Sequence, residues 1–269
     1  MKKTIKFITL IFLGIKLTSC NSTVPQNTSS SEFIPNESIK YELPQDTTNT
    51  NTQILENEGF VISYNLDLKA PNWVAWELTC EETRGNEKRT DWFTPDERIP
   101  QAYRVYHSDF SDSGYDRGHM FPAGDARWSK QAMLDCFNMT NMCMQLHELN
   151  DEGWRVLEES CRRWACTEGS LYIVCGPIFN NEKSPNRYRN KVAIPEGFFK
   201  VVMSLRPGHE RAIGFIYENS AIQQQMRDCA VSIDKIEEIT GLNFFYNLPD
   251  ELENKIERMS SFDRDWNLK

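Results

Sequence analysis

The segment from Tyr115 to Met120 carries side chains that are suited to phosphoryl chemistry. It reads Tyr-Asp-Arg-Gly-His-Met and places His119 close to both Asp116 and Arg117. An imidazole titrates near neutral pH and can take a proton from water, and a guanidinium can bind a phosphate through two N–H groups. The intervening glycine lets another backbone or a ligand approach closely. The pattern favours His119 as a general base beside an anion-binding arginine, although one histidine in a loop is weak evidence by itself.

A second set of polar residues follows at helical spacing. We predict a helix over residues 150–167, ended by Gly169, because its apolar residues recur with helical periodicity. At about 100° per residue, Asn150, Glu158 and Arg162 fall on one face of this helix, together with Trp154. Two structural interpretations stay open here. Asn150 is also a good helix N-cap, and Glu158 with Arg162 is also an ordinary i, i+4 ion pair.

The remaining elements are expected to build a sheet around which these residues are placed. Strands are predicted over residues 60–64, 73–78, 171–175, 199–205 and 212–217, and helices over 129–136 and 232–240. Strands and helices do not alternate regularly along the chain. The sequence therefore predicts an α+β fold with a mixed or antiparallel sheet core rather than a parallel βαβ fold.

The N-terminus has the features of an export signal. Three lysines precede an apolar run from Phe7 to Ile15 that is too short to span a bilayer, and Leu-Thr-Ser-Cys follows, ending at Cys20. This pattern resembles a bacterial lipobox, in which the cysteine is lipidated; the alternative is an ordinary secretory signal with an incidental cysteine. We predict a lipoprotein signal peptide over 1–19, a flexible Ser/Thr/Asn-rich tether over 20–57 and one domain over 58–269.

The part of the chain after the signal is strongly acidic. Residues 1–19 hold four lysines and no acidic residue, so the remainder has 26 basic and 39 acidic residues and a formal net charge of −13. This composition argues against a protein that binds nucleic acid through a broad basic surface. A nucleic-acid enzyme of this composition must rely on a local arginine cluster and a metal ion.

Cysteine usage fits an exported protein. The sequence has eight cysteines, and seven remain if Cys20 is lipidated. Disulfides are expected in an oxidising compartment, but an odd number leaves at least one thiol without an intrachain partner, and the pairing is not readable from the sequence. No Cys-x2-Cys pair is present, which argues against a structural zinc site.

Several ordered motifs resemble those of one enzyme family. The stretch Ser-Gly-Tyr-Asp-Arg-Gly-His-Met at 113–120 is similar to the signature of the DNA/RNA non-specific endonucleases, the endonuclease G-like ββα-metal family. Residues 89–96, 140–145, 149–158, 175–179, 194–202 and 236–245 also resemble family segments in the same order. One departure is Met144, where the family often has proline. The resemblance covers about residues 59–248 and implies a ββα-metal active-site motif.

The resemblance also implies roles for individual residues. His119 would activate water, Asn150 would be the one direct protein ligand of a hydrated Mg²⁺, and Mn²⁺ or another divalent cation is an alternative metal. Glu158 would hold metal-bound waters in the outer coordination layer. The remaining candidates would clamp phosphate, orient groups near the metal or position the histidine, and they are Arg89, Arg117, Arg162, Asn141 and Asp116.

The predicted function is sequence-non-specific hydrolysis of phosphodiester bonds in DNA and RNA by a lipid-anchored enzyme of the cell envelope. No base-reading motif such as a zinc finger or a recognition helix is present. Two alternatives remain: a catalytically inactive envelope lipoprotein that binds extracellular nucleic acid, and a structural lipoprotein. The expected partners are DNA and RNA substrates and the membrane, reached through Cys20. The sequence does not indicate whether a protein inhibitor or a second copy of the chain also binds, nor which face of the membrane the enzyme occupies.

Overall fold

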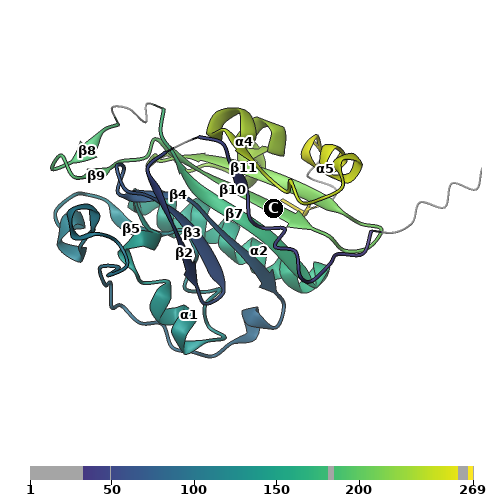
Figure 1. Ribbon diagram of the computed structural model, residues 1–269, viewed down its shortest axis with the longest axis horizontal. Helices are drawn as coiled ribbons and strands as arrows, with labels where there is room; N and C mark the ends of the chain where they lie inside the picture. The colour runs from purple at the N-terminus through teal and green to yellow at the C-terminus, as the bar shows by residue number, and fades with distance from the viewer. Residues whose placement is uncertain (1–32, 49, 181–184, 260–265, 269) are drawn as a thin grey trace, which may run out of the picture. The chain divides into compact units, whose positions relative to one another are not determined.

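A seven-stranded antiparallel sheet forms the centre of the fold in the computed structural model (Figure 1). The structure describes residues 33–48, 50–180, 185–259 and 266–268. In spatial order the sheet contains β12 (Ala230–Val231), β11 (Arg211–Glu218), β10 (Gly197–Ser204), β7 (Ser170–Ile178), β4 (Ala70–Thr79), β3 (Phe60–Asn65) and β2 (Thr52–Asn57). The α+β class with an antiparallel core is therefore confirmed.

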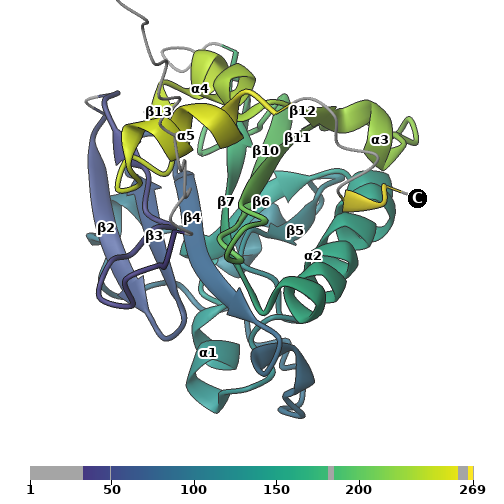
Figure 2. The same ribbon diagram turned by 90° about the vertical axis from the view of Figure 1, so that its right-hand side faces the viewer.

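Helices cover both faces of this sheet (Figure 2). One face packs against α2 (Arg155–Glu168) and α1 (Lys130–Asp135), and the other against α4 (Ile233–Thr240) and α5 (Asp250–Glu257). Along β10, Phe198 and Val202 belong to the first core, whereas Phe199 and Val201 belong to the second. This alternation follows from the two-residue period of a strand, and burial on both faces explains why the sequence of β10 is almost uniformly apolar.

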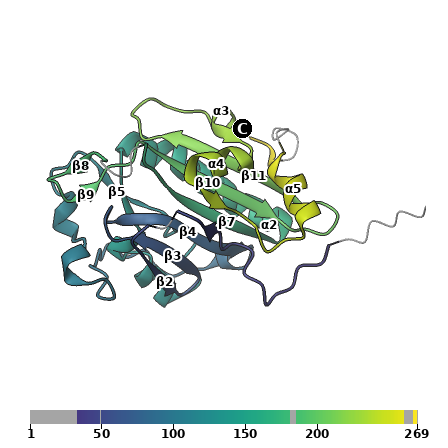
Figure 3. The ribbon, with the colours of Figure 1, turned by 45° about the horizontal axis from the view of Figure 1, so that its top comes forward.

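Figure 3 shows α4 and α5 lying over β10 and β11. Ile233, Ile236 and Ile256 supply the apolar contacts of these two helices with the sheet. The N-terminus of α4 is capped by the side chain of Ser232, which accepts a hydrogen bond from the backbone N–H of Lys235. Gly241, in the left-handed conformation at φ +70°, ends the helix where the sequence predicts it.

The helix predicted over residues 150–167 is also present. It starts with a wide π-helical turn, η5 (Leu149–Trp154), and continues as α2, so that Leu157, Cys161 and Ala165 pack on the sheet. The backbone N–H of Gly169 donates to the carbonyl oxygen of Ala165 (2.8 Å), and Gly169 has a φ of +96° that other residues rarely adopt. This glycine ends the helix and starts β7.

The shorter elements lie around this framework. They are β1 (Gln45–Asp46) paired with β13 (Leu242–Asn243), β5 (Asp116–His119) paired with β6 (Met142–Gln145), β8 (Arg187–Tyr188) paired with β9 (Val192–Ala193), α3 (Met226–Cys229), and the 3-10 turns η1 (Glu82–Arg84), η2 (Gln101–Tyr103), η3 (His107–Phe110) and η4 (Met139–Asn141). No helix of the described residues is long and apolar enough to cross a membrane.

The folded domain begins earlier than the sequence predicts. The tether was expected to extend from residue 20 to 57, but β2 forms an edge strand of the sheet and Tyr41 packs edge-on against Tyr172 in the core. An edge strand faces water along most of its length, and only Leu55 is buried in β2. Its polar composition therefore looks like that of a linker. The signal peptide, Cys20 and the first part of the predicted tether lie outside the described residues.

A disulfide joins Cys80, which follows β4, to Cys166 near the end of α2. The other cysteines of the described chain are buried free thiols, namely Cys136, Cys143, Cys161, Cys175 and Cys229. The sequence leaves the pairing open, and the structure shows one disulfide, between residues that are 86 positions apart.

Candidate active site

His119 is positioned by the pairing of β5 with β6. In this register His119 lies opposite Met142, and Gly118 lies opposite Cys143. A Cβ atom on residue 118 would lie 2.7 Å from the Cβ of Gln145, which is closer than real Cβ atoms approach. The close contact of the two strands therefore requires glycine at position 118. The same strand pairing fixes the position of the His119 backbone.

The imidazole of His119 is enclosed by aromatic rings. The ring centroid of Phe137 lies 4.7 Å from that of His119, and the centroid of Phe93 lies 5.8 Å away. Burial, assisted by the positive charge of Arg89 and opposed by a hydrogen bond to the backbone of Arg117, lowers the pKa of His119 to about 3. His119 is thus neutral near pH 7. Its Nε2 atom is buried and has no hydrogen-bond partner among the described residues, so no other group of the protein occupies it.

Two arginines stand on the rings that enclose His119. The guanidinium carbon of Arg117 lies 5.1 Å from the ring centroid of Phe93, and that of Arg89 lies 5.2 Å from the ring centroid of Phe137. These cation–π contacts hold the long side chains in place without consuming their N–H donors. The structure therefore brings Arg89, Arg117 and His119 together as the sequence predicts, in an arrangement that can bind an anion beside a neutral imidazole.

Asn141 has a structural position rather than one that faces the site. Its Oδ1 accepts from the backbone N–H of Phe121 (2.9 Å), and its Nδ2 donates to the carbonyl oxygens of Phe121 (2.9 Å) and Cys136 (2.8 Å). The side chain is completely buried. Asn141 was expected to orient groups around a metal. Both of its polar atoms instead bind backbone groups, so Asn141 fixes the backbone at Phe121, two residues after His119.

Asp116 connects β5 to the start of the long helix. Its Oδ2 accepts a hydrogen bond from Nδ2 of Asn150 (2.9 Å) and lies 2.9 Å from Nδ1 of His147. The hydrogen bond to Asp116 raises the pKa of His147, which is otherwise exposed. Asp116 therefore orients the Asn150 amide and makes no contact with the imidazole of His119 among the described hydrogen bonds. The contact between Asp116 and His147 was not predicted from the sequence.

Glu158 and Arg162 do not form the i, i+4 ion pair that was an open interpretation of their spacing. Nη1 of Arg162 instead donates to Oδ1 of the buried Asp125 (2.8 Å), and no ion pair to Glu158 occurs in the described residues. Burial raises the pKa of Glu158 to about 7, and the positive charges of Lys200 and Arg162 oppose this rise. Glu158 is thus an unpaired carboxyl group on the helix face that carries Asn150.

A buried lysine lies beneath these groups. Lys200 of β10 is completely buried, with its Nζ 4.4 Å from the ring centroid of Trp154 and 5.4 Å from that of Trp76. Sequence reasoning missed both Lys200 and Asp125. A lysine inside the apolar run Phe-Phe-Lys-Val-Val was the available signal for the first, because such a charge is rarely buried without a role; Asp125 stands in a loop and has no comparable pattern.

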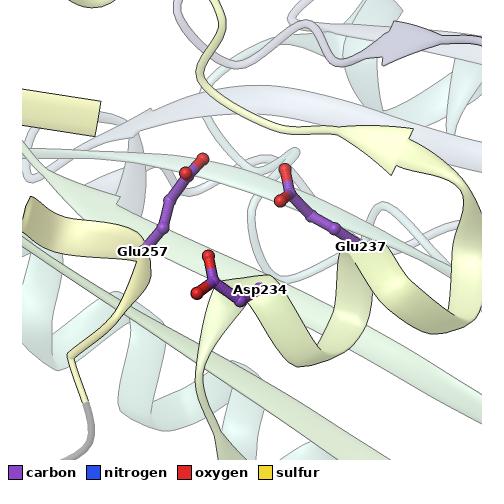
Figure 4. Close-up of side chains that lie close together, drawn as sticks. All are labelled: Asp234, Glu237 and Glu257. Carbon is purple, nitrogen blue, oxygen red and sulfur yellow. The ribbon is translucent and has the colours of Figure 1, made fainter. Parts of the chain in front are cut away.

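Another group of acidic side chains lies on the opposite face of the sheet (Figure 4). Asp234 and Glu237 of α4 and Glu257 of α5 place carboxylate oxygens within 4.8 Å of one another. Burial and the neighbouring carboxylates, Glu237 first, raise the pKa of Glu257 to about 8. This cluster contains none of the residues that surround His119. The candidate residues for a metal in the active site are therefore Asn150 and Glu158, and not these three carboxylates.

Comparisons with known proteins agree with this arrangement. Residues 37–251 match the family model described as DNA/RNA non-specific endonuclease. The mitochondrial nuclease of Saccharomyces cerevisiae is 34% identical over 214 residues, covering 71% of this chain and 65% of the yeast protein. A nuclease of a Nostoc species is 33% identical over 225 residues, covering 80% of each chain.

A similar solved structure leads to the same group. A chain in the crystal structure of an EndoG/EndoGI complex superposes with a TM-score of 0.68 at 26% identity, covering 74% of this chain and 88% of that one. The resemblance inferred from the ordered motifs is confirmed by both kinds of match. This chain belongs to the DNA/RNA non-specific endonuclease family of nucleases.

Proposed function

We propose that this nuclease hydrolyses phosphodiester bonds of DNA and RNA without sequence preference, with His119 as general base and Mg²⁺ as cofactor. The observation that carries the proposal is the buried, neutral imidazole of His119, whose Nε2 has no hydrogen-bond partner among the described residues and which packs against the two rings that carry the guanidinium groups of Arg89 and Arg117. A phosphodiester is anionic, so the two arginines offer it a binding place next to a group that can accept a proton.

The side chains on the long helix fit a magnesium ion. Asp116 holds the Nδ2 side of the Asn150 amide, and no hydrogen bond reaches Oδ1 of Asn150 within the described residues. Mg²⁺ binds oxygen ligands and keeps several waters, which the carboxyl of Glu158, on the same helix as Asn150, would hold. When bound, the ion would supply positive charge that stabilises the phosphate and the leaving oxygen. Mn²⁺ or another divalent cation uses similar oxygen ligands.

The chain's own residues perform the remaining tasks. Arg89 and Arg117 bind the phosphate oxygens, and Nε2 of His119 takes a proton from the attacking water. An anion bound at the arginines offsets the positive charge of Arg89 that lowers the pKa of His119. Substrate binding therefore moves the basicity of the imidazole toward its working range. Arg162, fixed by Asp125, keeps a positive field at Glu158.

A broad substrate range follows from the chemical groups of the substrate that the proposed site contacts. The charged side chains of this site address phosphate and metal, which are the same in every nucleotide, and such contacts carry no sequence information. The proposed site also requires no feature that only DNA or only RNA has. A catalytically inactive nucleic-acid binder is the less favoured alternative, because His119, Asn150 and Glu158 are all present and none is consumed by an ion pair in the described structure.

We further propose export and anchoring in the cell envelope through lipidated Cys20. The support is the signal-like sequence of residues 1–20 together with the Cys80–Cys166 disulfide, which fits an oxidising compartment. A protein inhibitor is a partner class to test, because the similar EndoG chain was crystallised in a complex with EndoGI. Export also makes physical sense for an unspecific nuclease, which would otherwise meet the cell's own DNA.

The test uses the purified protein with supercoiled plasmid and with RNA, in Mg²⁺ or in EDTA. We expect cleavage of both substrates that requires the metal, and His119→Ala should lower turnover by about 10²–10⁴-fold. His209→Ala is the matched control, because His209 is exposed on the turn between β10 and β11. Unchanged turnover in His119→Ala would remove this histidine from the mechanism, and cleavage in EDTA would remove the metal.

A further inference from the structure

Trp92 is exposed to an extent that no other tryptophan of the protein approaches. Its relative exposure is 75%, against 37% for Trp128, and the other five tryptophans are buried. Burying a large aromatic side chain is one of the strongest apolar contributions to folding or binding. An exposed tryptophan beside a candidate active site is therefore a candidate contact for a bound ligand.

The segment that carries Trp92 contributes side chains to two different places. Residues 85–93 belong to no helix or strand. Arg89 and Phe93 contact the aromatic pocket of His119, whereas Glu87, Lys88, Thr90 and Trp92 line a surface cavity. One short stretch of backbone thus connects the proposed phosphate clamp to a second surface only a residue away.

The segment is also braced, so that Trp92 is presented in a defined place. The backbone N–H of Trp92 donates to Oγ1 of Thr90 (3.2 Å). Just beyond Phe93, Thr94 forms a parallel bridge with Asn138, and its Oγ1 donates to Oδ1 of that residue (3.0 Å). The exposed indole therefore projects from a segment that is fixed at the aromatic pocket.

The cavity beside Trp92 has the composition of a site for a flat, weakly polar ring next to an anion. Its volume is 190 Å³, and Met133 and Leu134 of α1 provide apolar contacts. Lys88 and Lys130 bring two positive charges to its edge, and Glu87 brings one negative charge. The volume is below the range of about 300–1,000 Å³ typical of sites that enclose a complete drug-sized ligand, so the site suits part of a larger molecule.

We propose that Trp92, with Lys88 and Lys130, forms a subsite that stacks an unpaired nucleobase of the strand whose phosphate is bound at Arg89. This inference rests on the proposed function and extends it to a substrate class, namely nucleic acid with unstacked bases. The acidic composition supports it: the protein has a net charge of −9, so broad electrostatic attraction to the substrate is weak. Stacking does not depend on net charge and accepts any base, which is consistent with cleavage without sequence preference.

The experiment measures binding without cleavage. The full-length protein in detergent and EDTA is titrated with an oligothymidylate, with an abasic oligomer of the same length and with a blunt duplex, and the dissociation constants are compared. Trp92→Ala is the test variant and Trp92→Phe the conservative one. Trp128→Ala is the matched control, because Trp128 is the next most exposed tryptophan and does not line the cavity.

We expect Trp92→Ala to weaken binding of the oligothymidylate by about 5- to 150-fold, the range of one base stacked on an aromatic ring. Binding of the abasic oligomer and of the duplex should change little, Trp92→Phe should retain most of the affinity, and Trp128→Ala should resemble wild type. Quenching of tryptophan fluorescence by the oligothymidylate should be reduced in Trp92→Ala. Equal affinities of Trp92→Ala and wild type for the oligothymidylate, or an equal loss for the abasic oligomer, would overturn the subsite.

Cleavage assays on the same samples separate this inference from the proposed function. If the wild-type protein cleaves plasmid in Mg²⁺ while Trp92→Ala binds the oligothymidylate normally, the nuclease proposal stands and the stacking subsite is refuted. If the wild-type protein does not cleave but loses oligothymidylate binding on Trp92→Ala, the subsite stands and the catalytic proposal is refuted.

Discussion

Replacing Asn141 by Asp distinguishes a structural amide from a residue that acts on the metal or the substrate. Asp has nearly the same shape and keeps the oxygen that accepts from Phe121, but it replaces the NH₂ group by a second oxygen. That oxygen would face the carbonyl oxygens of Phe121 and Cys136, which now lie 2.9 Å and 2.8 Å from Nδ2. The change therefore turns two attractive contacts in a fully buried place into two repulsive ones.

The magnitude follows from the hydrogen bonds that are lost. Each of the two buried carbonyl oxygens that is left without a donor costs about 1–3 kcal/mol. We expect Asn141→Asp to lower the free energy of unfolding by about 3–5 kcal/mol and the Tm by on the order of 10 °C. Activity should fall with the folded fraction and with the displacement of His119, which precedes Phe121 by two residues.

The assay is urea unfolding followed by the fluorescence of the buried tryptophans, together with plasmid cleavage under conditions in which each variant is folded. Asn247→Asp is the control, because Asn247 donates only one long hydrogen bond, to the carbonyl oxygen of Lys40 (3.4 Å). An unchanged urea midpoint combined with lost cleavage in Asn141→Asp would refute the reasoning. That result would place the side chain among the groups that touch metal or substrate.

Three further predictions concern the framework around the site. Gly118→Ala should destabilise the protein by about 1–3 kcal/mol in urea unfolding, because the new methyl group meets Gln145; a midpoint equal to wild type would contradict this. The folded state holds a proton on Glu257 up to about pH 8, whereas the unfolded state releases it near pH 4.5, so stability should fall as pH rises through this range. Glu257→Gln should reduce that slope in thermal melts at several pH values, and an unaltered slope would exclude the carboxyl as its source. Replacing both Cys80 and Cys166 by Ser should cost about 3–5 kcal/mol, since the disulfide spans 86 residues; unfolding of that variant at the wild-type midpoint would argue against the bond.

Much of the fold was predictable because its central elements are strongly patterned. The buried strands near Val74 and Val201 are rich in apolar residues, and the two main helices end at Gly169 and Gly241, where a positive φ requires glycine. The start of the domain was not predictable in the same way. β2 is an edge strand with one buried side chain, and its pairing with β3 is decided by long-range contacts that a local pattern does not contain.

The candidate site shows the same division. Ordered motifs named His119 and Asn150; the structure packs His119 against Phe93 and Phe137 and bonds Asn150 to Asp116, and the roles of both residues stay predictions. The partners of Asp116 and Arg162 were not predictable, because each depends on a chain segment distant in sequence: Asp116 holds Asn150 across 34 residues, and Arg162 reaches Asp125 across 37. The i, i+4 spacing on one helix face suggested Glu158 as the ion-pair partner of Arg162. In the structure the partner is Asp125, a more deeply buried carboxylate from a distant segment.

The Cys80–Cys166 bond has a consequence for how this protein meets proteases. Every residue in the proposed catalytic set lies between these two cysteines in sequence, from Arg89 to Arg162. A single cut anywhere in that interval leaves the two fragments covalently joined, so the severed catalytic segment cannot diffuse away from the rest of the sheet. In an environment that contains both nucleic acids and proteases, the bond makes one backbone cleavage an event that the enzyme can survive with its active-site parts still together.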